Sequence, residues 1–128
     1  NISLSHSASD LTVQSDRFVF AEATLNVPDA LKILGGIELD GTDLGAANSR
    51  GSSICLGVTG VLNTTAAGSS ITLRGSKDVD AFMPIVAGGQ IGANGITWAG
   101  DGSSVSITAG QQIFLDAPIQ AAAAITLK

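Results

Sequence analysis

Hydrophobic and polar residues alternate with a period of two through the last third of the chain. The alternating runs cover residues 105–110, 112–119 and 124–128, and small residues rather than two-residue hairpin turns separate them. A period of two is typical of a β-strand with one buried and one exposed face. The pattern therefore predicts β-structure without hairpins in this part of the chain.

Short alternating runs also precede the C-terminal set. Glycine-containing pairs such as Gly35-Gly36, Asn94-Gly95 and Asp101-Gly102 lie between them, and these pairs favour turns. The chain is therefore predicted to be all-β. The earlier runs are residues 11–13, 18–20, 24–27, 37–39, 54–56, 71–73 and 96–98.

Two segments also suit a helix. Pro28 stands near the start of residues 28–34 and Gly35 follows them, an arrangement common at helix ends. Residues 121–124 are alanines, which have high helix propensity. Both segments are shorter than the ~12 residues that an isolated helix needs. A single helical turn after Val27 remains an alternative.

The spacing of the C-terminal runs is close to that of a repeat. Ile107 and Ile125 head similar strands, at an interval near the lower limit of about 20 residues for solenoid repeats. The longer interval from Ile71 to Ile96 suggests a loop inserted around residues 77–84. In a β-solenoid, aliphatic residues stack inward and threonines point outward. The predicted inward positions are Ile71, Leu73, Ile96, Trp98, Ile107, Ile113, Leu115, Ile125 and Leu127.

These patterns favour a right-handed parallel β-solenoid. A β-sandwich or jelly-roll subunit and an intertwined fibre subunit are the alternatives, because regularly spaced short strands also suit those folds. We expect a single all-β domain over residues 1–128, less regular in residues 1–50 and more repeat-like in residues 60–128.

The amino-acid composition limits the kinds of partner that the protein could bind. The hydrophobic fraction of 45% is enough to fill a core, and a net charge of −5 would repel a nucleic-acid backbone. No apolar run reaches the ~20 residues of a membrane-spanning helix. Between residues 81 and 127 the ionisable acids are Asp101 and Asp116, and Lys and Arg do not occur. The charge-poor segment 81–128 is therefore predicted to contact the same protein or a neighbouring subunit.

The sequence from Ser104 to Lys128 resembles a known repeat. Its phrases Ile-Thr-Ala-Gly-Gln-Gln-Ile-Phe-Leu-Asp-Ala-Pro-Ile and Ile-Thr-Leu are similar to the repeats of filamentous-haemagglutinin-like exoproteins of two-partner secretion. The resemblance implies a right-handed parallel β-helix that a partner outer-membrane transporter exports. It also implies a role in adhesion, haemolysis or contact-dependent toxin delivery.

The same phrases also resemble the β-helical spikes of phages and injection machines, in which three chains share each turn. That resemblance implies a subunit of an assembly. The predicted strand at residues 125–128 leaves a sheet edge, which needs a cover. Either a longer protein or a neighbouring subunit, paired by strand addition, would supply it.

The sequence gives little support for a catalytic site. His6 is the only histidine and stands in a serine-rich segment near Asp10, so a Ser-His-Asp arrangement can be written. The single cysteine, Cys55, lies between apolar residues, where a small buried side chain is the simpler role. Asp78 and Asp80, with Asp101 nearby, would suit glycoside hydrolysis. The simpler reading is a solvated loop, since no aromatic platform accompanies these acids.

Metal and modification signals are equally sparse. Asp40, Asp43 and Asp101 offer oxygen ligands for calcium, but none completes a calcium-binding loop. Asn63-Thr64-Thr65 matches a glycosylation acceptor, a pattern that often arises by chance. We therefore assign no catalytic, cofactor-binding or metal-binding residue, and expect no cofactor.

The sequence thus indicates a non-enzymatic extracellular or cell-surface module with a structural or adhesive role. It would act by shape and self-association, and a host-surface receptor is one further partner. The alternatives are a self-assembling subunit of a pilus, virion or phage fibre and, more remotely, a carbohydrate-active β-helix enzyme.

Overall fold

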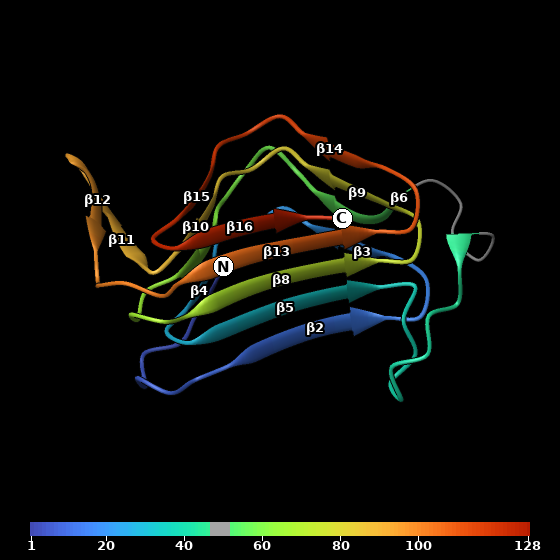
Figure 1. The fold of residues 1–128 in the computed structure, drawn as a ribbon, viewed down its shortest axis with the longest axis horizontal. Coiled ribbons are helices and arrows are strands. Elements are labelled where there is room, and N and C mark those ends of the chain that lie inside the picture. The colour runs from blue at the N-terminus through green and yellow to red at the C-terminus, as the bar shows by residue number, and fades with distance from the viewer. Residues whose placement is uncertain (47–51) are drawn as a thin grey trace.

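The computed structural model describes residues 1–46 and 52–128. Within these ranges the chain forms strands and no α-helix, so the prediction of an all-β protein is confirmed. The strands build three parallel sheets and one separate antiparallel hairpin (Figure 1). The three sheets are open, since none of them closes into a barrel.

Each sheet contains strands from widely separated parts of the chain. Sheet A has the order β1 (Ile2–Ser3), β4 (Leu25–Val27), β7 (Leu62–Thr64), β10 (Ile85–Ala87) and β15 (Ile119–Ala121). Sheet B has the order β2 (Leu11–Ser15), β5 (Ala30–Gly35), β8 (Ser70–Gly75), β13 (Ser104–Ala109) and β16 (Ala124–Leu127). Sheet C has the order β3 (Val19–Ala21), β6 (Ser52–Leu56), β9 (Asp78–Ala81) and β14 (Ile113–Leu115).

The chain visits the three sheets in a fixed succession. It passes from sheet A to sheet B to sheet C and then returns to sheet A, one strand further along. Figure 1 shows sheet B from β2 at the lower end to β16 at the upper end, with the other two sheets behind it. Within each of the three sheets, neighbouring strands come from successive circuits of the chain and run in the same direction, so the pairing is parallel.

One apolar core lies between the sheets. Buried side chains from all three sheets form a single cluster, including Leu62 of sheet A, Leu73 of sheet B and Val79 of sheet C. Each is fully buried, because alternate residues of a strand point to opposite faces of its sheet. Buried serines complete the interior through hydrogen bonds, such as the 3.2 Å contact between Ser53 Oγ and Ser76 Oγ.

Two insertions interrupt the regular succession. The first connects β5 to β6 and contains an isolated bridge between Ile37 and Asp43. The second is the hairpin of β11 (Gly89–Gly92) and β12 (Gly95–Trp98), placed between β10 and β13. In Figure 1 the hairpin projects to the left, beyond the start of β13.

The predicted insertion at residues 77–84 is wrong. That segment contains β9, an ordinary strand of sheet C, and the long interval arises from the hairpin instead. The pairing of sheet B is also shifted from the expected one, since Val105 rather than Ile107 pairs with Ile125. A two-residue shift keeps the same residues inward, so the sequence pattern does not distinguish the two registers.

Both helix candidates are wrong as well. Residues 30–35 form β5, which pairs with a strand on each side and contributes Leu31 and Ile33 to the core. The alanines at residues 121–124 end β15 and begin β16. Pairing within a sheet outweighs local helix propensity here, because propensity is a weak preference for so short a segment.

Candidate functional site

The predicted stacking positions on sheet B lie in two columns that run across the strands. The buried members Ile71, Leu73 and Ile107 are 0% exposed. One column contains Leu11, Leu31, Ile71, Val105 and Ile125, and the other Val13, Ile33, Leu73, Ile107 and Leu127.

The columns end in an uncovered apolar surface. Ile125 is 46% exposed and Leu127 is 48% exposed, although both continue the buried columns of sheet B. Ile113 and Leu115 of β14 are half-buried in the same way at the edge of sheet C. We call these four residues, together with Ile119 of β15, the open end.

Ile96 and Trp98 do not join the inward columns, and their prediction as inward stacks is wrong. Both lie on β12, which pairs antiparallel with β11 outside the three sheets, and Trp98 is 43% exposed. The turn at residues 93–94 is followed by Gly95, whose φ of 113° suits glycine alone. An Asn-Gly pair between two alternating runs strongly predicts a hairpin. The pair Asn94-Gly95 could therefore have identified this hairpin from the sequence.

Several core positions were missed in the first half of the chain. The sequence Ala-Leu-Lys-Ile-Leu-Gly of β5 has the same pattern as Ser-Ile-Thr-Leu-Arg-Gly of β8, with which it pairs in register. A comparison of these two segments would have identified Leu31 and Ile33 as counterparts of Ile71 and Leu73. The helix-like flanks of β5 concealed that similarity.

His6 and Asp10, the two residues named for a possible Ser-His-Asp arrangement, have separate hydrogen-bond partners. The His6 ring nitrogen Nδ1 accepts a long 3.5 Å hydrogen bond from the backbone N–H of Ala8. Asp10 Oδ1 accepts from the backbone N–H of Ala30 at 3.0 Å and thereby fastens β2 to the start of β5. The His6 contact is local, whereas the Asp10 contact joins two parts of sheet B, so the two side chains act separately.

The predicted acidic pair lies on sheet C. Asp78 and Asp80 belong to β9, and Asp80 accepts a hydrogen bond from the Ser52 hydroxyl. Asp101 instead lines a shallow groove with Trp98 and Ala121, near the hairpin. The structure therefore does not bring the three carboxylates into one site.

Cys55 is opposite Asp80 in the pairing of β6 with β9. Burial raises the pKa of the Cys55 thiol, and the nearby charges of Asp80 and Glu22 raise it further. A raised pKa keeps the thiol protonated, which disfavours its use as a nucleophile.

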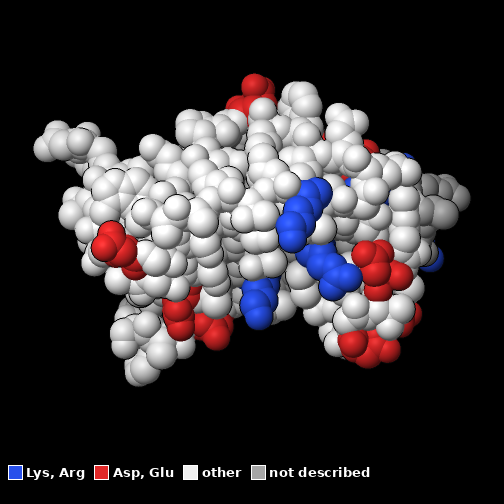
Figure 2. All heavy atoms as spheres, in the orientation of Figure 1, with Lys and Arg blue, Asp and Glu red and all other residues white. Residues whose placement is uncertain are grey.

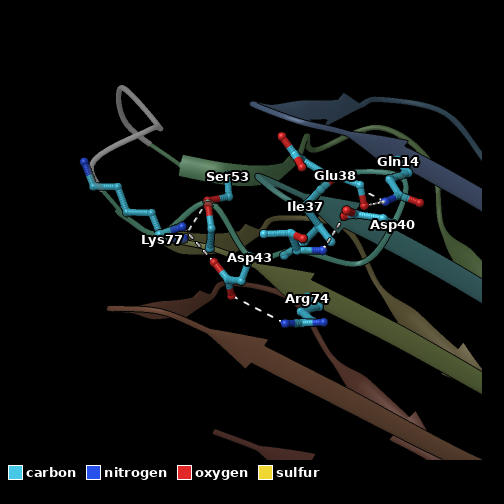
Figure 3. Close-up of polar contacts among 11 residues, drawn as sticks. Gln14, Ile37, Glu38, Asp40, Asp43, Ser53, Arg74 and Lys77 are labelled. Carbon is cyan, nitrogen blue, oxygen red and sulfur yellow. Dashed lines mark hydrogen bonds and ion pairs between the residues drawn. The ribbon is translucent and has the colours of Figure 1, made fainter.

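Asp40 and Asp43, two of the acids whose oxygen atoms would suit calcium, accept hydrogen bonds within their own loop (Figure 3). Asp40 Oδ1 accepts from the Thr42 N–H at 2.9 Å, and this hydrogen bond lowers the pKa of the Asp40 carboxyl. Asp43 Oδ2 lies 3.6 Å from the Arg74 guanidinium of sheet B. No group of three or more potential metal ligands occurs in residues 1–46 and 52–128.

The asparagine of the glycosylation pattern is inaccessible. Asn63 is 5% exposed, and its Nδ2 donates to the carbonyl oxygens of Thr64, Val86 and Gly89. A side chain so enclosed serves structure, since its amide nitrogen is already fully bonded.

The outer faces of the sheets differ in chemistry. Sheet C presents Phe20, which is 55% exposed and stacks with Phe18, and Phe114, which packs against Phe82 at 5.6 Å. Sheet B instead carries basic and hydroxyl side chains; Figure 2 shows the basic residues at the middle of this face, with acidic residues around it. The basic members on sheet B include Lys32 and Arg74.

Comparison with known protein families found no match, and comparisons with characterised proteins and with solved structures found no significant relative. In the described part of the chain, no helix has the length and apolar character required to cross a bilayer.

Proposed function

We propose that the protein is a non-enzymatic structural module that acts by shape and self-association. In this proposal the three parallel sheets form a right-handed β-solenoid, and the open end stacks on a second copy of the chain. The observation that carries the proposal is the continuation of two buried apolar columns onto β16, where Ile125 and Leu127 are 46% and 48% exposed.

Unpaired backbone groups at the open end also favour stacking on a second copy. β14, β15 and β16 are the outermost strands of their sheets, so one edge of each carries backbone groups without a strand partner in the described chain. An unpaired edge is a template for another strand, and adding one also covers apolar side chains. Hydrogen bonding and apolar burial therefore favour the same partner geometry.

The opposite end offers a matching surface. β1, β2 and β3 are the outermost strands there, one from each sheet, and Leu11 and Val13 head the two columns of sheet B. A second copy stacked end to end would continue both columns with the same strand direction. Such a head-to-tail contact does not close on itself, so it generates a filament.

The resemblance of residues 104–128 to haemagglutinin-like repeats supports an extracellular or cell-surface location, with adhesion as the wider role. A subunit of a pilus, virion or phage fibre is the second candidate, favoured by the aromatic outer face of sheet C, where Phe20 is 55% exposed. Exposed aromatic residues are common at protein interfaces. A carbohydrate-active enzyme has less support, because Asp80 is bonded to Ser52 and Asp101 lies elsewhere.

Light scattering across a dilution series tests the proposal. We expect masses above that of the 12.7 kDa chain, increasing with concentration. The double variant Ile125→Lys, Leu127→Lys should remain monomeric, because burying two ammonium groups without partners is costly. Thr126→Lys is the matched control, since Thr126 pairs with outward-facing Ser106 on the same strand. A monomer at every concentration, or equal effects of the two sets of changes, would contradict the proposal.

A further inference from the structure

The hairpin of β11 and β12 has two chemically different flanks. Paired residues of an antiparallel ladder lie on the same face. Gln90 pairs with Thr97 and forms a polar flank, whereas Ile91 pairs with Ile96 on the opposite flank. The hairpin therefore separates a polar surface from an apolar one.

The base of the hairpin is fixed to sheet A. Asn63 Nδ2 donates to the carbonyl oxygen of Gly89 at 2.8 Å, and the Ala99 N–H donates to the carbonyl oxygen of Gly88 at 2.9 Å. These two contacts hold both ends of the hairpin. The groove between its polar flank and sheet A is consequently preformed.

This polar groove has a volume of about 580 Å³ and is open to solvent. Its walls combine amide and hydroxyl side chains with a few aliphatic ones, and no lining side chain is ionisable. Its members include Ser3, Thr24, Asn26, Val61, Gln90 and Thr97.

Asn26, one of the residues that line the polar groove, has unused hydrogen-bonding capacity. Its Nδ2 donates a long 3.4 Å hydrogen bond to Ser3 Oγ, and its buried Oδ1 has no hydrogen-bond partner. A buried amide oxygen without a partner costs roughly 1–3 kcal/mol. Rotation of the amide toward a bound hydroxyl group would remove that cost.

We propose that the polar groove binds a neutral, unbranched oligosaccharide. Amide and hydroxyl side chains both donate and accept hydrogen bonds, as sugar hydroxyls do. A charged ligand would find no opposite charge among the lining side chains. Val61, which also lines the polar groove, offers an apolar contact to the C–H face of a sugar ring.

The geometry of sheet A also suits a repeating ligand. Ser3 and Asn26 are neighbours in one column across β1 and β4, and both line the polar groove. Neighbouring strands are ~4.8 Å apart, a spacing comparable to the length of one sugar unit along a linear chain. Two successive sugar units would therefore meet Ser3 and Asn26.

Titration of the ¹⁵N-labelled chain with cellohexaose, laminarihexaose, maltohexaose and mannohexaose tests this inference. With at least one probe, we expect amide shifts concentrated at Thr24, Asn26, Gln90 and Thr97. Thr97→Val removes a hydroxyl group without changing side-chain volume and should weaken binding about three- to tenfold, the value of one hydrogen bond. Thr126→Val, on the outer face of sheet B, is the matched control and should not change the affinity.

Several outcomes would overturn the inference: no shift with any of the four sugars at millimolar concentration, shifts located on another face, or equal affinities for Thr97→Val and the unaltered chain. Tighter binding of hexagalacturonate than of the neutral probes would also contradict it, as would preferential binding of an uncharged Gly-Ser-Asn peptide in the groove. The inference does not depend on self-association, because the polar groove lies within one chain. Light scattering and titration can therefore fail independently.

Discussion

Asn63 Nδ2 lies 2.8 Å from the carbonyl oxygen of Gly89, so a buried side chain of sheet A holds the first residue of the projecting hairpin. The same nitrogen donates to the carbonyl oxygen of Val86 at 3.1 Å. One amide thus joins the regular sheet to its insertion. This contact determines how the hairpin stands over the polar groove.

Replacement of Asn63 should test that role. Asn63→Ala should lower the free energy of unfolding by about 1–3 kcal/mol, because buried carbonyl oxygens lose their donor. Urea denaturation measures the change. Gln120→Ala is the matched control, since Gln120 carries an exposed amide on the same face of sheet A, and a loss below about 0.5 kcal/mol is expected there. Equal losses would show that the Asn63 contacts add no stability.

The stability lost on truncating a side chain to alanine should decrease along one apolar column, from its buried members to its exposed end. Leu73 is 0% exposed and Leu127 is 48% exposed, and both occupy the same column of sheet B. Leu73→Ala should cost about 2–5 kcal/mol, because it leaves a cavity among fixed neighbours. Leu127→Ala should cost much less in the monomer, so its stability is best measured at high dilution. Similar losses for the two variants would contradict the assigned core.

Substitutions at two glycines distinguish the cost of backbone strain from the cost of steric overlap. Gly68 and Gly88 have φ of 73° and 81°, a conformation that disfavours other residues. A Cβ at Gly68 meets nothing within 4 Å, whereas a Cβ at Gly88 would overlap the Ser103 side chain. Gly68→Ala should therefore cost roughly 1–2 kcal/mol and Gly88→Ala clearly more. Thermal unfolding compares the two, and a reversed order would contradict this close approach.

The thiol of Cys55 should react slowly at neutral pH. Burial, followed by the charges of Asp80 and Glu22, raises its pKa, so less thiolate is present than for a free cysteine at the same pH. The alkylation rate with iodoacetamide should rise with pH along a curve displaced to higher pH. Asp80→Asn should move that curve toward lower pH by removing a negative charge.

Asp116→Asn, which changes an exposed acid directly after β14 of sheet C, is the control for the Cys55 measurement and should move the curve less. An unchanged curve in Asp80→Asn would show that Asp80 does not influence the thiol. Reaction at the rate of a free cysteine in the unaltered chain would contradict the raised pKa.

Prediction from sequence succeeded where alternation is regular. Ile71, Leu73 and Ile107 were identified as inward residues, and each is fully buried. It failed where local signals conflict, as at Pro28 and Gly35, whose helix-like placement concealed β5. Asp78, Asp80 and Asp101 were considered as one cluster, but the fold places Asp101 on a different surface.

The polar groove was not predicted from the sequence, because its walls come from distant segments. Asn26 lies on β4 and Thr97 on β12, and only the fold brings them to the same groove. Each residue is unremarkable in its local sequence. The Asn94-Gly95 pair was the one local sign of a hairpin in this segment.

The sequence by itself determined that the chain is all-β and which side of most strands faces inward, because the period of two depends only on strand geometry. The tertiary structure decided which strands pair, since the pairing of Val105 with Ile71 and Ile125 depends on contacts across insertions of unequal length. It also decided that Ile96 and Trp98 lie on a hairpin, where antiparallel pairing replaces stacking in the core. The alternation of apolar and polar residues determines which face of a strand is buried. Which strands pair depends on contacts between distant segments, and a short segment does not contain that information.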